Sequence, residues 1–168
     1  VASRKFWEFN LAENPPHRIF MEEAIRLAAQ GAGLTSPNPQ VGAVVVKNDR
    51  IIGRGYHLFE ARDHAEVVAL REAGAGSEGA DLYVTLEPCN HQGRARPCVD
   101  LIKRSNIKRV FIALLDPNPD VAGGGARSLR SAGIEVGIGL CETEVRKQLE
   151  AYLHYSKYKR PFIQLKLA

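Results

Sequence analysis

The regular alternation of short β-branched segments with amphipathic helical segments is the feature that most constrains the fold of this chain. Strand patterns are expected at residues 41–46, 51–57, 81–88, 108–115, 134–139 and 162–167. Helical patterns are expected at residues 17–31, 64–73, 98–106, 126–133 and 142–158. Strands that alternate with helices form a central sheet that helices cover on both faces, so the sequence predicts an α/β fold, a three-layer α/β/α sandwich. The first two strands are separated by a short polar turn and are expected to form an antiparallel hairpin, which makes the sheet mixed.

The length and charge of the chain narrow the classes of function. The 168 residues suffice for one compact domain, expected at 17–168 after an N-terminal extension at 1–16. The longest apolar stretch, Val41–Val46, is too short to span a bilayer, and the N-terminus has no apolar signal segment. We therefore expect a cytoplasmic protein without membrane contact. A net charge of +4 suits a small anionic substrate such as a sugar phosphate and gives little support for nucleic acid binding. An ordinary soluble surface explains that charge equally well.

Three short segments contain residues that could bind a metal: the tripeptide HAE at 64–66, Cys89 and Cys98. One imidazole and two thiolates suit zinc and leave its fourth tetrahedral position open for water. Zinc lowers the pKa of such a water, and Glu66 is placed to carry the proton to a leaving amino group. Residues two apart do not share a face within a helix, so His64 and Glu66 are expected at a helix start. Cys89 and Cys98 are expected at or near helix starts, where the helix dipole favours a thiolate.

The spacing of the cysteines separates this chain from the general pattern of zinc-dependent nucleobase deaminases. That pattern is H-x-E followed by P-C-x-x-C, whereas eight residues, NHQGRARP, separate Cys89 from Cys98 here. A purely structural zinc site is the alternative, and His91 in the spacer could supply its fourth ligand. Cys141 is distant from these motifs along the chain and is expected to be a buried small hydrophobe.

Longer stretches carry a family resemblance, namely PNPQVGAVVV, HAEVVAL, LYVTLEPCNHQGRARPC, DPNPDVAGGG and RPFIQLKLA. Through them the chain resembles the riboflavin-biosynthesis family of diaminohydroxyphosphoribosylaminopyrimidine deaminases, of the cytidine-deaminase-like superfamily. The resemblance implies a zinc-dependent hydrolase that deaminates 2,5-diamino-6-ribosylamino-4(3H)-pyrimidinone 5′-phosphate. It implies zinc ligands His64, Cys89 and Cys98, and Glu66 as the catalytic residue. The chain departs from the family pattern around the mouth of the expected site, at Ala61, Ala95 and Arg96.

The same resemblance implies a set of substrate-binding residues: Asn38, His57, Arg94, Asp116 and Asn118. Amide side chains can bind the edge of a heterocycle, and the Arg94 guanidinium can bind a phosphate by paired hydrogen bonds. Each residue type also has a plainer explanation. Asn38 and Asn118 precede prolines in turns, where asparagine is favoured for backbone reasons. His57 could be a buried, satisfied histidine, Arg94 could be a solvated surface residue, and the glycines at 123–125 could serve backbone conformation alone.

Two other functions stay open on the sequence. One is deamination of another nucleobase, nucleoside or tRNA, and the other is a non-catalytic zinc-binding module derived from a deaminase. The end of the chain, RPFIQLKLA, resembles the junction into a reductase domain that the sequence lacks. We expect that reductase as a separate or fused partner, and we expect a homo-oligomer, a dimer or a tetramer.

Overall fold

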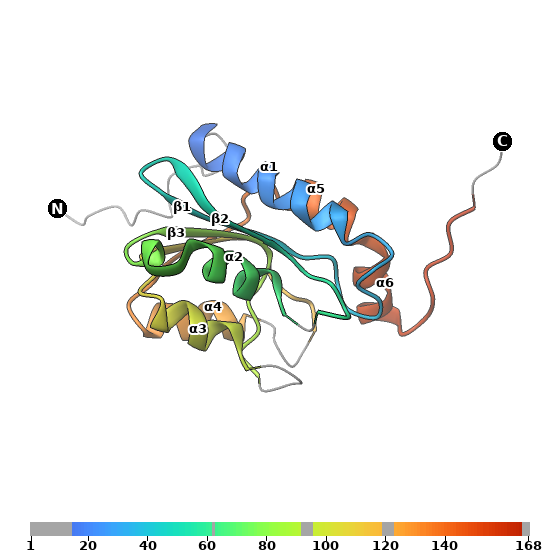
Figure 1. The fold of residues 1–168 in the computed structure, drawn as a ribbon. Coiled ribbons are helices and arrows are strands. Elements are labelled where there is room, and N and C mark those ends of the chain that lie inside the picture. Colours follow the sequence, from blue (N-terminus) through green and yellow to red (C-terminus); the bar gives the residue numbers. More distant parts are fainter. Residues whose placement is uncertain (1–14, 62, 92–95, 119–122, 166–168) are drawn as a thin grey trace.

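The computed structural model describes residues 15–61, 63–91, 96–118 and 123–165, and these residues form a five-stranded mixed sheet with helices on both faces (Figure 1). The strand order in the sheet is β2-β1-β3-β4-β5. The strands are β1 (Gly42–Lys47), β2 (Arg50–Tyr56), β3 (Asp81–Leu86), β4 (Arg109–Leu114) and β5 (Glu135–Ile138). The predicted fold class is confirmed.

The sheet is mixed because its two halves are connected differently. Strands β1 and β2 pair antiparallel across a turn in which Asn48 and Asp49 both have positive φ, 50° and 57°, as tight hairpin turns require. Strand β1 is also antiparallel to β3, whereas β3, β4 and β5 run parallel. The carboxyl ends of β3 and β4 therefore meet at one edge of the sheet, which is where ligands bind in open α/β sheets.

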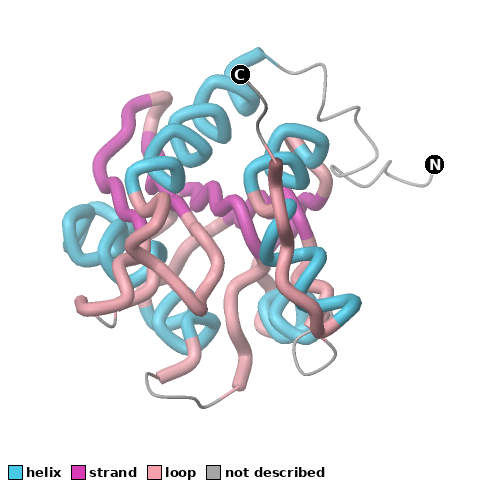
Figure 2. The backbone as a smooth tube through the Cα atoms, turned by 90° about the vertical axis from the view of Figure 1, so that its right-hand side faces the viewer, coloured by secondary structure: helices cyan, strands magenta, loops and turns pink. Residues whose placement is uncertain are grey.

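Two helical layers cover the sheet. Helices α1 (Pro15–Gln30) and α5 (Glu142–Gln148) lie on one face (Figure 1). Helices α2 (Ala65–Ala73), α3 (Cys98–Arg104) and α4 (Gly124–Ser131) lie on the other face, and a 3₁₀ turn (Gly74–Ser77) follows α2. Figure 2 shows the strands between these layers. No helix of the described ranges has both the length and the apolar character needed to cross a bilayer.

Alternate side chains of each central strand enter opposite cores. Val44 and Tyr83 pack with the α1 and α5 layer, whereas Val45, Leu82 and Val84 pack with the α2, α3 and α4 layer. All of these side chains are buried, which explains why the strands read as nearly continuous apolar segments instead of alternating ones. Each face of the sheet is thus covered by a hydrophobic core.

The expected single helix at 142–158 is wrong, because the chain forms two helices there. Helix α5 ends at Gln148, and α6 (Glu150–Tyr158) follows after Leu149, whose φ and ψ are −96° and 13°. Leu149 is buried in the core beside α5, whereas α6 has no buried residue. Leu149 is thus the last fully buried position among the described residues, and Tyr152 and Leu153 of α6 pack only partly buried against the same core.

The two ends of the described chain also differ from expectation. The sequence predicts the first helix from His17, but α1 begins at Pro15, since the missing N–H of a proline is not needed in the first turn. The strand expected at 162–167 is wrong for 162–165, which form no strand; residues 166 and 167 lie outside the described residues. The side chains of Ile163 and Leu165 are 82% and 79% exposed, so no neighbouring strand covers them.

Candidate metal centre and active site

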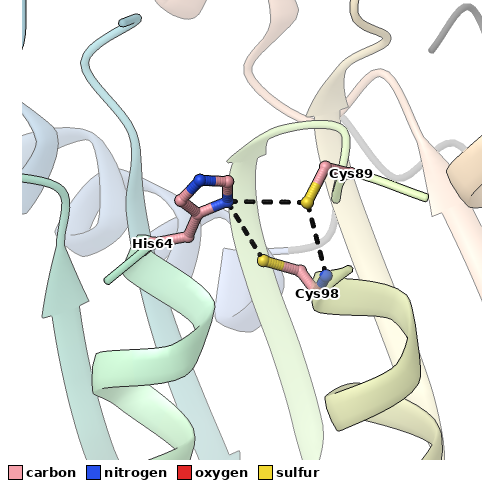
Figure 3. Close-up of side chains that lie close together, drawn as sticks. All are labelled: His64, Cys89 and Cys98. Atoms are coloured by element: carbon pink, nitrogen blue, oxygen red, sulfur yellow. Dashed lines mark hydrogen bonds between the residues drawn. The ribbon is translucent and has the colours of Figure 1, made fainter. Parts of the chain in front are cut away.

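Three side chains that are distant in sequence converge at one edge of the sheet (Figure 3). His64 immediately precedes α2, Cys89 lies three residues after β3, and Cys98 is the first residue of α3. The Nδ1 atom of His64 lies 3.6 Å from Sγ of Cys89 and 3.2 Å from Sγ of Cys98. All three candidate ligand atoms lie within 4.8 Å of one another.

These distances fit a tetrahedral zinc ion. Zinc bonds of about 2.0–2.1 Å to nitrogen and about 2.3 Å to sulfur separate the two ligand atoms by about 3.6 Å at the tetrahedral angle. The separation between His64 and Cys89 equals this value, and the separation between His64 and Cys98 is a few tenths of an ångström shorter. Within the described ranges, no further histidine, cysteine or carboxylate joins this group. Three protein ligands without a fourth are typical of catalytic zinc sites.

The local electrostatics favour a thiolate at Cys89. Hydrogen bonds from the Cys98 thiol, the His64 ring and the Cys98 backbone lower the pKa of Cys89 to about 4, against the opposing effect of burial. The backbone N–H of Cys98 lies 3.3 Å from Sγ of Cys89. The expectation that Cys89 itself lies near a helix start is therefore wrong. Cys89 is in a loop, and the start of α3 stabilises its thiolate through space.

Glu66 lies in the first turn of α2, beside the three candidate ligands but not among them. The predicted helix start is confirmed, because His64 is extended at φ −75° and ψ 159° and the helix begins at the next residue. The Glu66 side chain is buried and hydrogen-bonded to Cys98, and burial raises its pKa. A buried carboxyl group beside a metal site, with its pKa raised, suits a role in proton transfer.

His57 and Asn38 form a pair next to His64. His57 Nδ1 donates to the backbone carbonyl of Asp63 at 2.9 Å, and its Nε2 accepts from the Asn38 amide at 3.0 Å. The His57 and His64 rings stand edge to face, with 5.5 Å between their centroids. Because both nitrogens of the buried His57 ring bond within the protein, this ring orients Asn38, which is exposed.

Asp116 and Asn118 lie on the loop after β4, at the same edge of the sheet as Cys89. The Asp116 carboxylate accepts a hydrogen bond from the backbone N–H of Asn118 at 2.9 Å, and burial raises its pKa. Arg94 lies outside the described residues, as does Ala95. Ala61 and Arg96 are exposed.

Glu87 belongs to the site region, although it is not among the site residues expected from the sequence. Its carboxylate is buried and accepts hydrogen bonds from three backbone N–H groups, those of Asp116 at 3.2 Å, Gly123 at 2.8 Å and Ala126 at 2.9 Å. Glu87 therefore joins the strand that leads to Cys89 to the loop that carries Asp116 and to the start of α4. A charged residue between an apolar strand and Pro-Cys is the signal that could have identified it.

The glycines at 123–125 have two different roles. Gly123 has φ +75°, a conformation that favours glycine. Gly125 has no such φ, but a Cβ there would lie 2.1 Å from the backbone oxygen of Pro88, and one at Gly124 would lie 2.4 Å from the Asn90 amide. Backbone conformation alone therefore explains only Gly123. The other two glycines allow α4 to approach the loop that holds Cys89.

The two remaining candidates of the sequence do not join the metal group. His91 is exposed and is not within ligand distance of the other three residues. Cys141 is buried in the core beside α5, as expected of a small hydrophobe, and burial raises the pKa of its thiol.

Replacing Glu87 by glutamine should lower the free energy of unfolding by about 1–3 kcal/mol, because an amide cannot accept all three backbone hydrogen bonds. Urea titration of the zinc-loaded protein measures this change. Glu78→Gln is the matched control, since Glu78 is exposed, and its effect should stay within about 0.5 kcal/mol. Equal unfolding midpoints for Glu87→Gln and the unmodified protein would contradict the assigned role.

Known proteins that are similar to this chain are deaminases or proteins of riboflavin biosynthesis. Residues 15–114 match the family described as the cytidine and deoxycytidylate deaminase zinc-binding region. The riboflavin biosynthesis protein RibD of Aquifex aeolicus is 54% identical over 149 residues, which are 89% of this chain and 42% of that protein. The chain therefore spans less than half the length of this relative.

Solved structures of relatives share the fold. A structure of Acinetobacter baumannii RibD superposes with a TM-score of 0.85 at 45% identity, covering 88% of this chain and 42% of that chain. The Thermotoga maritima diaminohydroxyphosphoribosylaminopyrimidine deaminase/5-amino-6-(5-phosphoribosylamino)uracil reductase superposes with a TM-score of 0.83 at 47% identity. That match covers 89% of this chain and 44% of the Thermotoga chain.

Proposed function

Because this chain belongs to the cytidine and deoxycytidylate deaminase zinc-binding family, we propose that it deaminates 2,5-diamino-6-ribosylamino-4(3H)-pyrimidinone 5′-phosphate by zinc-dependent hydrolysis, releasing ammonia. The observation that carries the proposal is the buried Glu66 beside a group of one histidine and two cysteines with zinc-compatible spacing. The similarity to riboflavin biosynthesis proteins supports the choice of a pyrimidine.

The proposed zinc ligands are Nδ1 of His64 and the Sγ atoms of Cys89 and Cys98. Zinc bound there supplies a Lewis acid that makes water a nucleophile at neutral pH. In the metal-free protein only Cys89 is prepared as a ligand, because the Cys98 backbone N–H and the His64 ring stabilise its thiolate. The pKa values of His64 and Cys98 are raised, so zinc must displace a proton from each of them. Thiolate ligands also suit zinc better than harder divalent cations.

Glu66 is proposed to move the proton. Its carboxylate takes a proton from the attacking water and delivers it to the nitrogen that leaves as ammonia. Burial of Glu66 raises its pKa, which favours the protonated form needed for this delivery. The place of Glu66 in the first turn of α2, one residue after the helix begins, holds the carboxylate beside the proposed ligands.

The substrate is proposed to lie between two groups of polar residues. Asn38, oriented by His57, approaches from the loop before β1, and Asp116 and Asn118 approach from the loop after β4. Amide and carboxylate groups can form hydrogen bonds with the edge of the ring and with the ribose hydroxyls. The Thermotoga relative is named a deaminase and reductase, so a fused or separate reductase partner stays a prediction for this chain, as does a homo-oligomer.

Replacing Arg94 by alanine should lower kcat/KM for the phosphorylated pyrimidine by about tenfold or more, because charge-assisted paired hydrogen bonds to a phosphate are lost. The dephosphorylated compound should react equally slowly with both proteins. Steady-state ammonia release gives kcat/KM of the variant and of the unmodified protein for each of the two compounds. Equal losses for the two compounds would mean that Arg94 does not bind the phosphate.

A panel of substrates tests the proposed function itself. Ammonia release is measured from the phosphorylated pyrimidine, its dephosphorylated form, cytidine, guanine and a tRNA that carries the target adenosine. The proposal predicts the highest kcat/KM for the phosphorylated pyrimidine. A higher kcat/KM for a nucleoside, guanine or the tRNA would mean that the proposed substrate is wrong, whereas zinc-dependent hydrolytic deamination would still be the reaction. No release from any of these compounds by a zinc-loaded protein would favour a non-catalytic zinc module.

A further inference from the structure

Helix α6 reaches the proposed substrate loop through the side chain of Tyr152. The hydroxyl of Tyr152 donates to the Asp116 carboxylate, at 3.0 Å from Oδ1 and 3.2 Å from Oδ2. Helix α6 lies outside residues 15–114, the part that matches the deaminase family. Tyr152 is half-buried, and its ring packs against the core beside α5 while its hydroxyl reaches Asp116.

Asp116 is held from three directions. Its backbone N–H donates to Glu87 at the end of β3, its Oδ1 accepts from the backbone of Asn118, and its carboxylate accepts from Tyr152. The Glu87 contact fixes the main chain, whereas the other two fix the side chain. Tyr152 is the contact from outside the loop that fixes the carboxylate, which would otherwise rotate about its χ angles.

A carboxylate has about four acceptor sites on its two oxygens. The Asn118 backbone and the Tyr152 hydroxyl occupy part of this capacity and determine which way the remaining lone pairs point. Those remaining sites suit donors such as a sugar hydroxyl or a ring amino group. The direction of the carboxylate therefore decides whether such a donor is bound in the correct place.

We propose that Tyr152 is a positioning residue for substrate binding: its hydroxyl orients the Asp116 carboxylate toward the hydroxyl or amino donors of the substrate. The inference rests on the proposed function, because it assumes that Asp116 contacts the substrate. Tyr152 contacts none of His64, Cys89, Cys98 and Glu66 by any hydrogen bond that the described residues make. Its effect is thus on binding and not on the chemical step.

Tyr152→Phe removes only the hydroxyl and tests this role. KM for the phosphorylated pyrimidine should rise about tenfold, while kcat stays within about twofold, since an interaction equal in ground and transition states is lost. The protein should keep one zinc per chain and stay folded, with a Tm lower by at most about a few degrees because one hydrogen bond is lost. Calorimetric binding of the product, 5-amino-6-(5-phosphoribosylamino)uracil, should weaken by the same factor. Tyr155 is an exposed tyrosine on the same helix, and Tyr155→Phe is the matched control. It should change neither KM nor the binding of the product.

A double-mutant cycle separates positioning from packing. In an Asp116→Ala background, Tyr152→Phe should have no further effect on KM, because the group that it orients is absent. An equal further rise in KM, or a fall in Tm with unchanged KM, would overturn the inference. So would wild-type kinetics for Tyr152→Phe in an active protein. A zinc-loaded wild-type protein that does not deaminate the pyrimidine would instead overturn the proposed function, and the two failures are therefore distinguishable.

Discussion

Replacing Glu66 by glutamine is expected to leave a folded, zinc-loaded protein that releases ammonia about 10²–10⁴ times more slowly. Glutamine has nearly the same shape as glutamate and can keep a hydrogen bond to Cys98, but its amide cannot carry a proton. The loss should appear in kcat and in kcat/KM alike, because proton transfer occurs only in the chemical step. Single-turnover ammonia release measures this rate without interference from product release.

A second glutamate of the same helix gives the matched control. Glu72 accepts the backbone N–H of Arg54 at 2.8 Å, and a glutamine at that position still accepts it. Glu72→Gln should therefore keep both the zinc and the rate. If Glu66→Gln deaminated at the rate of the Glu72→Gln control, Glu66 would not be the proton carrier.

Replacing Cys98 by serine is expected to abolish both zinc retention and activity. A serine hydroxyl is a poor zinc ligand at neutral pH, and Cys98 is buried at the start of α3, where no other side chain of the ligand group can substitute for it. After dialysis against a chelator and back into zinc, the variant should hold well below half an ion per chain. Ammonia release should fall to less than about 1% of the unmodified rate.

Cys141 supplies the control for this substitution. It is the third cysteine of the chain, it is buried, and it lies outside the metal group. Cys141→Ser places a hydroxyl in the core and can lower stability, but it should leave one zinc per chain. Elemental analysis compares the two variants directly. Full zinc in Cys98→Ser would refute the proposed ligand set.

The fold could be predicted largely because local pattern and global architecture agree. The strands around Val44 and Tyr83 are buried on both faces, and a sheet between two helical layers buries such strands when helices alternate with them along the chain. The metal group could be predicted for a related reason. One histidine and two cysteines in such motifs have few functions other than binding a metal. In a helical segment, His and Glu two residues apart point the same way only at its start, which places the motif in the fold.

What could not be predicted depends on contacts between segments that are distant in the sequence. The break at Leu149 depends on where the fully buried positions end, and the missing strand at 162–165 depends on the absence of a neighbouring edge within the described residues. Glu87 and Tyr152 act through hydrogen bonds to residues 29 and 36 positions away, at Asp116. Sequence spacing alone contains no signal for such pairs.

The most direct test of a zinc-dependent deaminase centre is a zinc titration of the metal-free protein that follows ammonia release from the phosphorylated pyrimidine. No release is expected before zinc is added, and the rate should then rise linearly and saturate at one zinc per chain. One ammonia should be released for each molecule of 5-amino-6-(5-phosphoribosylamino)uracil formed. A rate that does not depend on zinc, or a protein that saturates with one zinc and releases no ammonia, would contradict a zinc-dependent deaminase centre.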